Sequence, residues 1–327
     1  MDEARIAQIV DAVKRQLAAE GAGSAVQPSP SLPAPASAPA PSQPSAAPAS
    51  AQAPAAAGSD SPAHQRNLVI DLPDPTIPEW RYKARVADPK DPQTLKELIA
   101  STTARIGVGR AGPRYTTASL LLFQGDHAVT QDALYRDIDQ KLLDEFALFT
   151  VQTNITGGKE EYLLRPDLGR QLSDEAKRTI NEKCAKNPNI QVVVGDGLSA
   201  AAIEANLRQI FPVIKQGAQA AGLSMGTPFH IKYARVGVMN DVGEVIKPDV
   251  VILLIGERPG LGRAESMSVY MGYKPKYGDT DAERDVVCNI FENGGTNPLE
   301  AGAYVIQIAQ KMRQHKASGV KLKLATK

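Results

Sequence analysis

Two short turns carry the residues best suited to bind a ligand. The turn Asp196–Ser199 follows closely on the apolar run Val192–Val194, and the turn Gly256–Gly262 directly follows the run Val250–Ile255. Unbroken apolar runs of this kind are typical of parallel strands that are buried on both faces. Ligands of open α/β sheets bind in the crevice at the carboxyl ends of such strands. We therefore expect the binding chemistry of the chain to lie in these two turns.

The first turn combines an acceptor with a flexible backbone. Gly197 can adopt a positive φ, and the hydroxyl of Ser199 can cap the helix predicted over Ala200–Gln219. Capping alone explains the serine. Asp196 can also accept a hydrogen bond from a ligand hydroxyl or amide, and the amides at the helix start can bind an anionic or carbonyl group. Structural and ligand-binding roles therefore both remain open for Asp196 and Gly197.

The second turn places a carboxylate at the mouth of the sheet. Glu257 lies between Gly256 and a glycine-rich stretch, so the backbone here can approach a ligand closely. One interpretation of Glu257 is an ion pair with Arg258 or Arg263. The position at the end of a buried strand favours the other interpretation, in which Glu257 accepts hydrogen bonds from ligand amides.

The segment Gly107–Gly112 matches the G-x-G-x-x-G pattern of dinucleotide-binding loops. Its context differs, because that pattern needs a strand before it and a helix opening within it. Here a helical pattern precedes it and Pro113 follows it. We expect a turn between helices, in which Arg105, Arg110 and Arg114 contact acidic or phosphate groups of a partner. A nicotinamide-dependent oxidoreductase is retained as an alternative function.

The composition limits the remaining classes of function. No nucleophile elbow, Walker-type loop or cysteine–histidine pair is present, so no catalytic residue is assigned. Cys184 and Cys288 are too few for a disulfide framework, and the four histidines lack metal-ligand spacing. The 37 basic residues nearly balance 36 acidic ones, which argues against nucleic-acid binding. No apolar stretch is long enough to span a membrane, so we expect a cytoplasmic protein.

The chain begins with two segments that precede the folded body. Residues 1–20 place apolar side chains at helical spacing and predict a short amphipathic helix. Residues 21–66 are rich in alanine, proline and serine and predict a disordered linker. A helix displayed on such a tether suits a targeting tag. The alternatives are that the helix folds back on the body or pairs with a copy of itself.

Residues 67–150 predict an extended arm, Leu68–Asp88, followed by a small helical subdomain. Its helices are expected over Pro92–Arg105, Thr116–His127 and Gln131–Leu148. A strand over Leu143–Thr153 competes with the end of the last helix.

Residues 151–327 predict an α/β domain with a Rossmann-like, doubly wound parallel sheet, because strand, turn and helix patterns alternate. Strands are expected at Ile190–Val194, Pro228–Val236 and Val250–Ile255. Further helices are expected, together with Ala200–Gln219, over Glu175–Asn187 and Pro298–Lys316. The basic tail His315–Lys327 is expected to be frayed.

Several short strings together resemble one family. They are Gly109–Arg114, Arg165–Arg170, Asp196–Ser199, Gly226–Phe229, Val250–Gly262 and Lys316–Gly319. In this order and spacing the chain is similar to the small subunit of ethanolamine ammonia-lyase, from about Leu95 to Gly319. The resemblance implies a subunit that holds adenosylcobalamin against a large barrel subunit, which binds ethanolamine. The complex converts ethanolamine to acetaldehyde and ammonia, and this subunit is not expected to be active alone.

The resemblance also implies particular cofactor contacts. The family's valine corresponds to Val236, after Arg235, and its glutamate corresponds to Glu257. Its cysteine lies two residues after the arginine that corresponds to Arg284. That position is Val286 here, and the nearest thiol, Cys288, lies two residues further on. A backbone contact would survive this change, whereas a contact that needs the thiol would not.

Enzymes of the same pathway can carry a short amphipathic helix that directs them into a protein-shelled microcompartment. The resemblance therefore implies the same role for residues 1–20, with the shell as a further partner. A third possibility is a purely structural subunit that stiffens its partner without touching the cofactor.

Overall fold

A six-stranded sheet organises the chain in this computed structural model, which describes residues 77–102, 104–261, 263–292 and 294–326. The strand order is β3 (Phe149–Gln152), β5 (Phe229–Lys232), β4 (Ile190–Gly195), β6 (Val250–Gly256), β7 (Met267–Tyr273) and β8 (Arg284–Ile290). The first four are parallel, and β7 and β8 are antiparallel to their neighbours. The predicted α/β fold with a mostly parallel sheet is therefore confirmed, while the two antiparallel strands were not predicted.

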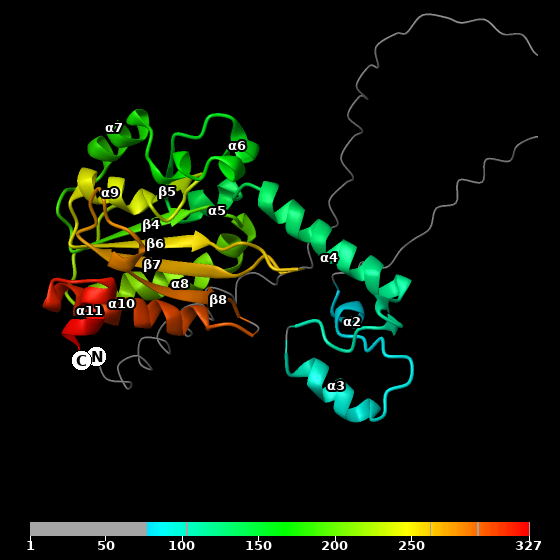
Figure 1. The fold of residues 1–327 in the computed structure, drawn as a ribbon. Helices are drawn as coiled ribbons and strands as arrows, with labels where there is room; N and C mark the ends of the chain where they lie inside the picture. Colours follow the sequence, from blue (N-terminus) through cyan, green and yellow to red (C-terminus); the bar gives the residue numbers. More distant parts are fainter. Residues whose placement is uncertain (1–76, 103, 262, 293, 327) are drawn as a thin grey trace, which may run out of the picture. The chain divides into compact units, whose positions relative to one another are not determined.

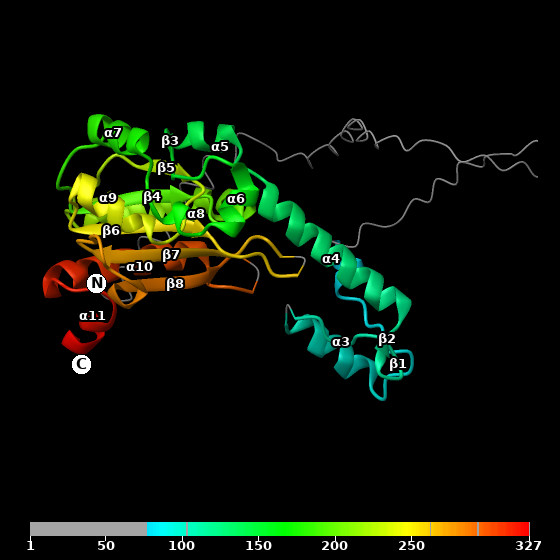
Figure 2. The same ribbon diagram turned by 45° about the horizontal axis from the view of Figure 1, so that its top comes forward.

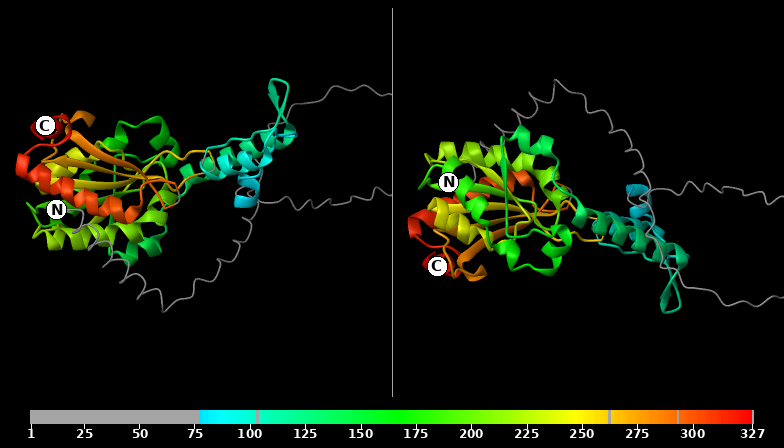
Figure 3. Two further views of the ribbon diagram at one scale, coloured as in Figure 1. Left: turned by 90° about the horizontal axis from the view of Figure 1, so that it is seen from below. Right: turned by 90° about the horizontal axis from the view of Figure 1, so that it is seen from above.

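Helices cover both faces of this sheet (Figures 1 and 2). On one face lie α7 (Asp174–Lys183) and α9 (Val238–Ile246), and on the other lie α8 (Ala200–Ala220) and α10 (Pro298–His315). Figure 3 shows each face in turn, with α8 and α10 side by side in the view from below. Every residue of β4 and β6 is buried, as expected of central strands that are covered on both sides.

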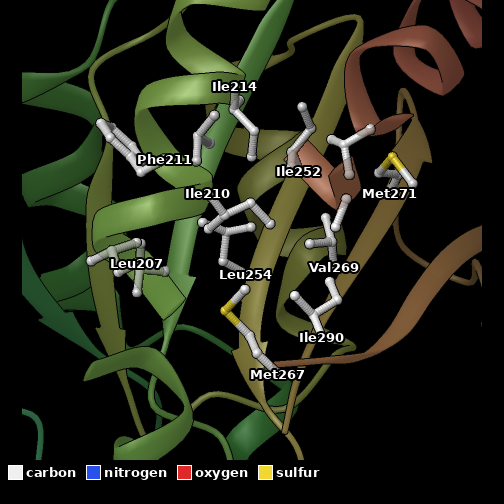
Figure 4. Packing of buried hydrophobic residues seen from close by; sticks show 14 of the residues in the cluster. Leu207, Ile210, Phe211, Ile214, Ile252, Leu254, Met267, Val269, Met271 and Ile290 are labelled. Atoms are coloured by element: carbon white, nitrogen blue, oxygen red, sulfur yellow. The ribbon is translucent and has the colours of Figure 1, made fainter. Parts of the chain in front are cut away.

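The larger core lies between the sheet and the helices α8 and α10. Figure 4 shows Ile210 and Ile214 of α8 facing Ile252 and Leu254 of β6. Side chains of β7 and β8 extend the same cluster: Met267, Val269, Met271 and Ile290. The antiparallel strands are therefore packed on the α10 side. On the α9 side, Val286 of β8 is 47% exposed, so the described part of the chain leaves this area open.

The segment before the sheet differs from its prediction. It contains α2 (Pro78–Arg81), α3 (Pro92–Ala100), a hairpin of β1 (Arg110–Ala111) and β2 (Arg114–Tyr115), α4 (Thr117–Tyr135) and α5 (Gln140–Glu145). The expected break after His127 is wrong, because α4 continues to Tyr135. The chain then leaves the helix in an extended conformation, and the Asp139 side chain caps α5 by accepting a hydrogen bond from the Lys141 amide.

The glycine pattern at 107–112 enters this hairpin. Gly112 has φ +62° at the hairpin turn, and a short helix rather than a strand precedes the glycines. The expected turn between helices is therefore a β-hairpin. The dinucleotide interpretation has no support, because no helix opens within the pattern.

The frayed tail is also a wrong prediction. Residues Gly319–Ala325 form α11, in which Leu322 is buried against the main core. The start of α11 is fixed by side chains, because the Gly319 amide donates to Asp285 Oδ2 at 2.6 Å. These contacts involve strand β8, which the sequence pattern did not predict.

The predicted helix over 1–20 and linker over 21–66 lie outside the described residues, as do residues 68–76 of the Leu68–Asp88 arm; the described part of that arm contains the short helix α2, so it is not extended throughout. Of the helices that the structure does describe, none is both long and apolar enough to span a bilayer.

Candidate functional site

The two predicted turns interlock at the carboxyl ends of the neighbouring strands β4 and β6. The amide of Leu198 donates to the carbonyl of Gly256 at 3.0 Å. Gly197 has φ +58°, as predicted, and a Cβ at this position would overlap the Gly256 carbonyl oxygen. A Cβ on Gly256 would in turn overlap the Ser199 carbonyl oxygen. Both glycines are therefore needed for the close approach of the two turns.

Ser199 has the predicted structural role. Its hydroxyl oxygen accepts a hydrogen bond from the Ala202 amide at 3.3 Å and so caps α8. The same hydroxyl donates to the carbonyl oxygen of Ala264 at 2.5 Å. This second bond ties the first turn to the loop between β6 and β7.

Asp196 faces the interior of the protein. Its buried carboxylate accepts hydrogen bonds from the amides of Tyr233 at 2.9 Å and Ala234 at 3.0 Å. The ammonium of Lys159 lies 3.3 Å away. These contacts end strand β5 at Lys232, so the predicted strand over Pro228–Val236 is too long. In this structure the carboxylate of Asp196 fixes the segment that leads to Val236.

The crevice expected at the topological switch point is filled by the chain itself. It lies between β4 and β5, because the helices that follow them, α8 and α9, pack on opposite faces of the sheet. Tyr162 of α6 (Gly158–Leu164) covers this position and donates its hydroxyl to the Ala234 carbonyl at 2.8 Å. Burial raises the pKa of Tyr162, and the negative charge of Asp196 raises it further. The side chains of Tyr162 and Asp196 therefore occupy this crevice.

Val236 lines a polar cavity of about 720 Å³ next to the filled crevice. The cavity lies between the 3₁₀ turn η1 (Leu168–Arg170), the start of α9 and the loop before β8 that contains η2 (Asp281–Glu283). Its polar lining includes Arg170, Lys177, Arg235, Asn240, Asp241 and Arg284. Lys177 forms an ion pair with the buried Asp241 at 3.3 Å. Burial alone would lower the pKa of Lys177. The attraction of Asp241 and the other contacts of Lys177 together outweigh this effect, so the pKa of Lys177 is raised.

Glu257 is half-buried and directed toward strand β7. Its Oε1 accepts a hydrogen bond from the Tyr270 hydroxyl at 3.4 Å, and its amide donates to the Ser266 carbonyl at 3.0 Å. Burial, together with the charge of Glu257, raises the pKa of Tyr270 to about 12. Within the residues that the structure describes, Glu257 forms no ion pair with Arg258.

Val286 lies beside Tyr270 on the edge strand β8. The two residues are partners in the antiparallel β7–β8 ladder, so their side chains share one face of the sheet. The ladder register shifts between Val287 and Ile290, which places the exposed Cys288 in an irregular part of the strand. Tyr270 and Val236 both pack against the core cluster beneath α7 and α9.

The predicted site residues therefore fall into two groups. Glu257 and Val286 lie beside Tyr270 on the open, α9 side of the sheet, and Val236 packs against the core on the same side, while Asp196 and Gly197 support the turns behind them. Sequence reasoning missed Tyr270, because strand β7 was not predicted. The alternation of apolar side chains over Met267–Tyr273 was the available signal. Among the described residues, no cluster of three or more His, Cys, Asp or Glu has the arrangement of a metal site.

The chain is similar to known proteins over most of its length. The model of the family described as ethanolamine ammonia-lyase light chain (EutC) matches residues 92–323. An ethanolamine ammonia-lyase small subunit from Clostridium perfringens is 46% identical over 252 residues, which are 77% of this chain and 85% of the relative. Small subunits from Clostridioides difficile and Clostridium tetani are each 44% identical; they align over 79% and 81% of this chain and over 86% and 91% of their own lengths.

Proposed function

The chain belongs to the family of ethanolamine ammonia-lyase light chains, and from this membership we propose that it holds adenosylcobalamin against the large subunit of that enzyme. The complex would convert ethanolamine to acetaldehyde and ammonia, with the ethanolamine bound by the large subunit. The observation that carries the proposal is that Val236, Glu257 and Val286 lie on one open side of the sheet, where Glu257 accepts a hydrogen bond from Tyr270 and Val286 pairs with Tyr270 in the ladder.

The chemistry of this face fits a corrin. Val236 and Val286 offer partly exposed apolar side chains to the ring, and the Glu257 carboxylate offers an acceptor for amide side groups of the corrin. The pKa of Tyr270, about 12, keeps its hydroxyl protonated, so that it donates to Glu257 and holds that carboxylate in place. Open apolar surface of this kind suits a site that a second chain completes. When bound, adenosylcobalamin supplies an organic radical by homolysis of its cobalt–carbon bond.

The chain's own residues bind and orient in this proposal, and none acts on ethanolamine. Asp196 and Tyr162 hold the segment that carries Val236, while the interlocked glycines place Glu257. Val286 stands where the family has a cysteine, so contact at this position is made through the backbone or the apolar side chain.

A second surface supports association with the large subunit. Helix α4 buries the polar residues Ser119 and Asp126 but exposes Leu120 and Leu121. An ordinary surface helix shows the opposite pattern, with its apolar side chains buried and its polar ones exposed. The neighbouring hairpin exposes Arg110 and Arg114, which form no ion pair with a carboxylate in the described part of the chain. We assign this surface to a partner face that is apolar and carries carboxylates.

Encapsulation in a microcompartment remains a proposal that rests on the amphipathic pattern of residues 1–20 and the tether after them. A fluorescent reporter fused to residues 1–20 should enter shells assembled in the same cell. A diffuse reporter would count against the targeting role.

The decisive experiment measures acetaldehyde release from ethanolamine with adenosylcobalamin present. This chain alone and a matching large subunit alone should be inactive, and the mixture should be active. In the assembled complex, Glu257→Gln should weaken adenosylcobalamin binding about tenfold, because a charged acceptor is replaced by a neutral one. Glu182→Gln, an exposed position on α7, is the matched control and should bind the cofactor normally.

Two results would contradict the proposal in different ways. An inactive mixture of well-folded subunits would refute the assigned reaction. An active mixture in which Glu257→Gln leaves cobalamin affinity unchanged would support the purely structural alternative for this chain.

A further inference from the structure

The cavity beside Val236 contains more positive charge than its own carboxylates neutralise. It is lined by four cations, Arg170, Lys177, Arg235 and Arg284, and by three carboxylates, Asp241, Asp279 and Asp281. Lys177 is paired with Asp241, and Arg284 is paired with Asp281. The Asp279 carboxylate accepts a hydrogen bond from the Lys276 amide at 3.0 Å. Within the described residues, Arg170 and Arg235 have no carboxylate partner.

Two of these arginines also have buried donors that bond to nothing in the described structure. The Nε atoms of Arg235 and Arg284 are both buried without a hydrogen-bond partner, and the Arg284 side chain is only 6% exposed. A buried unsatisfied donor costs about 1–3 kcal/mol, and more when it is charged. Such groups are expected where a ligand supplies the missing acceptor.

Arg235 and Arg284 are held in place before any ligand binds. Arg235 donates from Nη2 to the Tyr162 carbonyl at 3.0 Å, and its guanidinium lies 4.2 Å from the centre of the Tyr162 ring. Arg284 donates to Asn240 Oδ1 at 3.1 Å, and Asn240 is fixed by its own bond to the Asp279 carbonyl at 2.9 Å. A rigid guanidinium fork of this kind matches the geometry of phosphate and carboxylate oxygens.

We infer that this cavity is an anion-binding subsite that takes the phosphodiester of the cobalamin nucleotide. The inference rests on the proposed function, because the cavity shares Val236 with the face proposed for the corrin. The phosphodiester is the anionic group on the periphery of adenosylcobalamin, and the rest of its nucleotide loop and amides are uncharged. Arg170, Arg235 and Arg284 are the residues that contact it.

The test compares two corrinoids in the assembled complex. Adenosylcobinamide lacks the phosphodiester and the base, whereas adenosylcobalamin has both. Arg170→Gln and Arg235→Gln should each weaken adenosylcobalamin binding about tenfold and leave adenosylcobinamide binding unchanged, as measured by equilibrium dialysis with absorbance detection. Adenosylcobinamide phosphate carries the anion without the base. The two variants should therefore bind it more weakly than the parent does. Arg178→Gln, an exposed arginine on α7 outside this cavity, is the control.

Folding defects are separated by two further observations. Arg170 is exposed, so its variant should melt like the parent, and Arg235→Lys should retain part of the selectivity for the phosphodiester because it keeps the charge. An equal loss of affinity for both corrinoids would overturn the subsite while leaving cofactor binding intact. Unchanged cofactor affinity with weaker association of the large subunit would overturn it in favour of a partner carboxylate. Failure of the parent complex to bind either corrinoid would instead refute the proposed function.

Discussion

His230 is a buried base on the central part of the sheet. Its side chain is 4% exposed, Nδ1 lies 3.1 Å from Thr150 Oγ1, and Nε2 has no hydrogen-bond partner among the described residues. Burial lowers the pKa of His230 to about 4. Four charged groups also act on this pKa and partly cancel. Asp196 and Asp137 oppose the shift, whereas Lys232 and Lys159 add to it.

This histidine should make the fold sensitive to mild acid. The unfolded chain takes up a proton near pH 6.5, whereas the folded chain does so only near pH 4, so the free energy of unfolding falls as the pH falls through that window. The expected loss between pH 7 and pH 5 is about 2 kcal/mol. In urea unfolding, His230→Gln should show a smaller loss over this range than the parent. His315→Gln, at an exposed histidine, should follow the parent, and parallel profiles for all three proteins would contradict the prediction.

At the scale of single residues, the sequence predicted the positions that local pattern or family motif marks. Glu257 is identifiable because it follows a fully buried strand, and Gly197 because a tight turn needs a positive φ. The inward orientation of Asp196 was not predictable, because its partners Tyr233 and Ala234 lie 37 and 38 positions away in the chain. Contacts of this range depend on the packing of the whole sheet rather than on local propensity.

At the scale of elements, the interlocked turns couple β4 to β6. Gly197→Ala should strain a left-handed conformation, at about 1–2 kcal/mol, and also push the Gly256 carbonyl away, at about 1–3 kcal/mol more. Because Glu257 follows Gly256, the variant should bind adenosylcobalamin more weakly in the assembled complex. Thermal unfolding and cofactor titration of the same preparations measure both effects.

Gly222 provides a matched control for this substitution. It has a similar φ of +66°, but no atom lies within 4 Å of the position that a Cβ would occupy. Gly222→Ala should therefore show only the conformational cost and no change in cofactor affinity. Equal destabilisation by the two substitutions would mean that the contact between the turns is unimportant.

The elements that the sequence predicted are those with a single dominant signal. Strands β4 and β6 are uninterrupted apolar runs, and α8 and α10 carry clear apolar faces with capping residues. Helix α9 was missed because its start depends on where β5 ends, and Asp196 determines that point from another strand. Strand β8 was missed because, on the open side of the sheet, its side chains are not buried by the described part of the chain.

At the scale of the whole molecule, the proposed function assigns the cofactor and the large subunit to two different open surfaces. The face around Tyr270 presents groups suited to a cofactor, whereas α4 and the β1–β2 hairpin present leucines and arginines that form no ion pair with a described carboxylate and are suited to a protein. The two are linked through the described chain by specific bonds, such as that from Thr130 Oγ1 of α4 to the Gly260 carbonyl at 2.9 Å. Gly260 belongs to the same turn as Glu257, so a partner that docks on α4 would contact an element bonded to the turn proposed to bind the cofactor.

The α4 surface can be tested with one leucine. Leu121 is 60% exposed, so Leu121→Asp should leave the fold of this chain intact. If the large subunit covers Leu121, the complex loses the burial of one leucine, about 1.5–3 kcal/mol, and must also desolvate a carboxylate. Association with the large subunit, measured by analytical ultracentrifugation, should then weaken at least tenfold. Leu324→Asp, at a leucine of α11 that is 66% exposed, serves as the control. Unchanged association would contradict the assignment of this surface, and a change only in self-association of the isolated chain would reassign the surface to a contact between two copies.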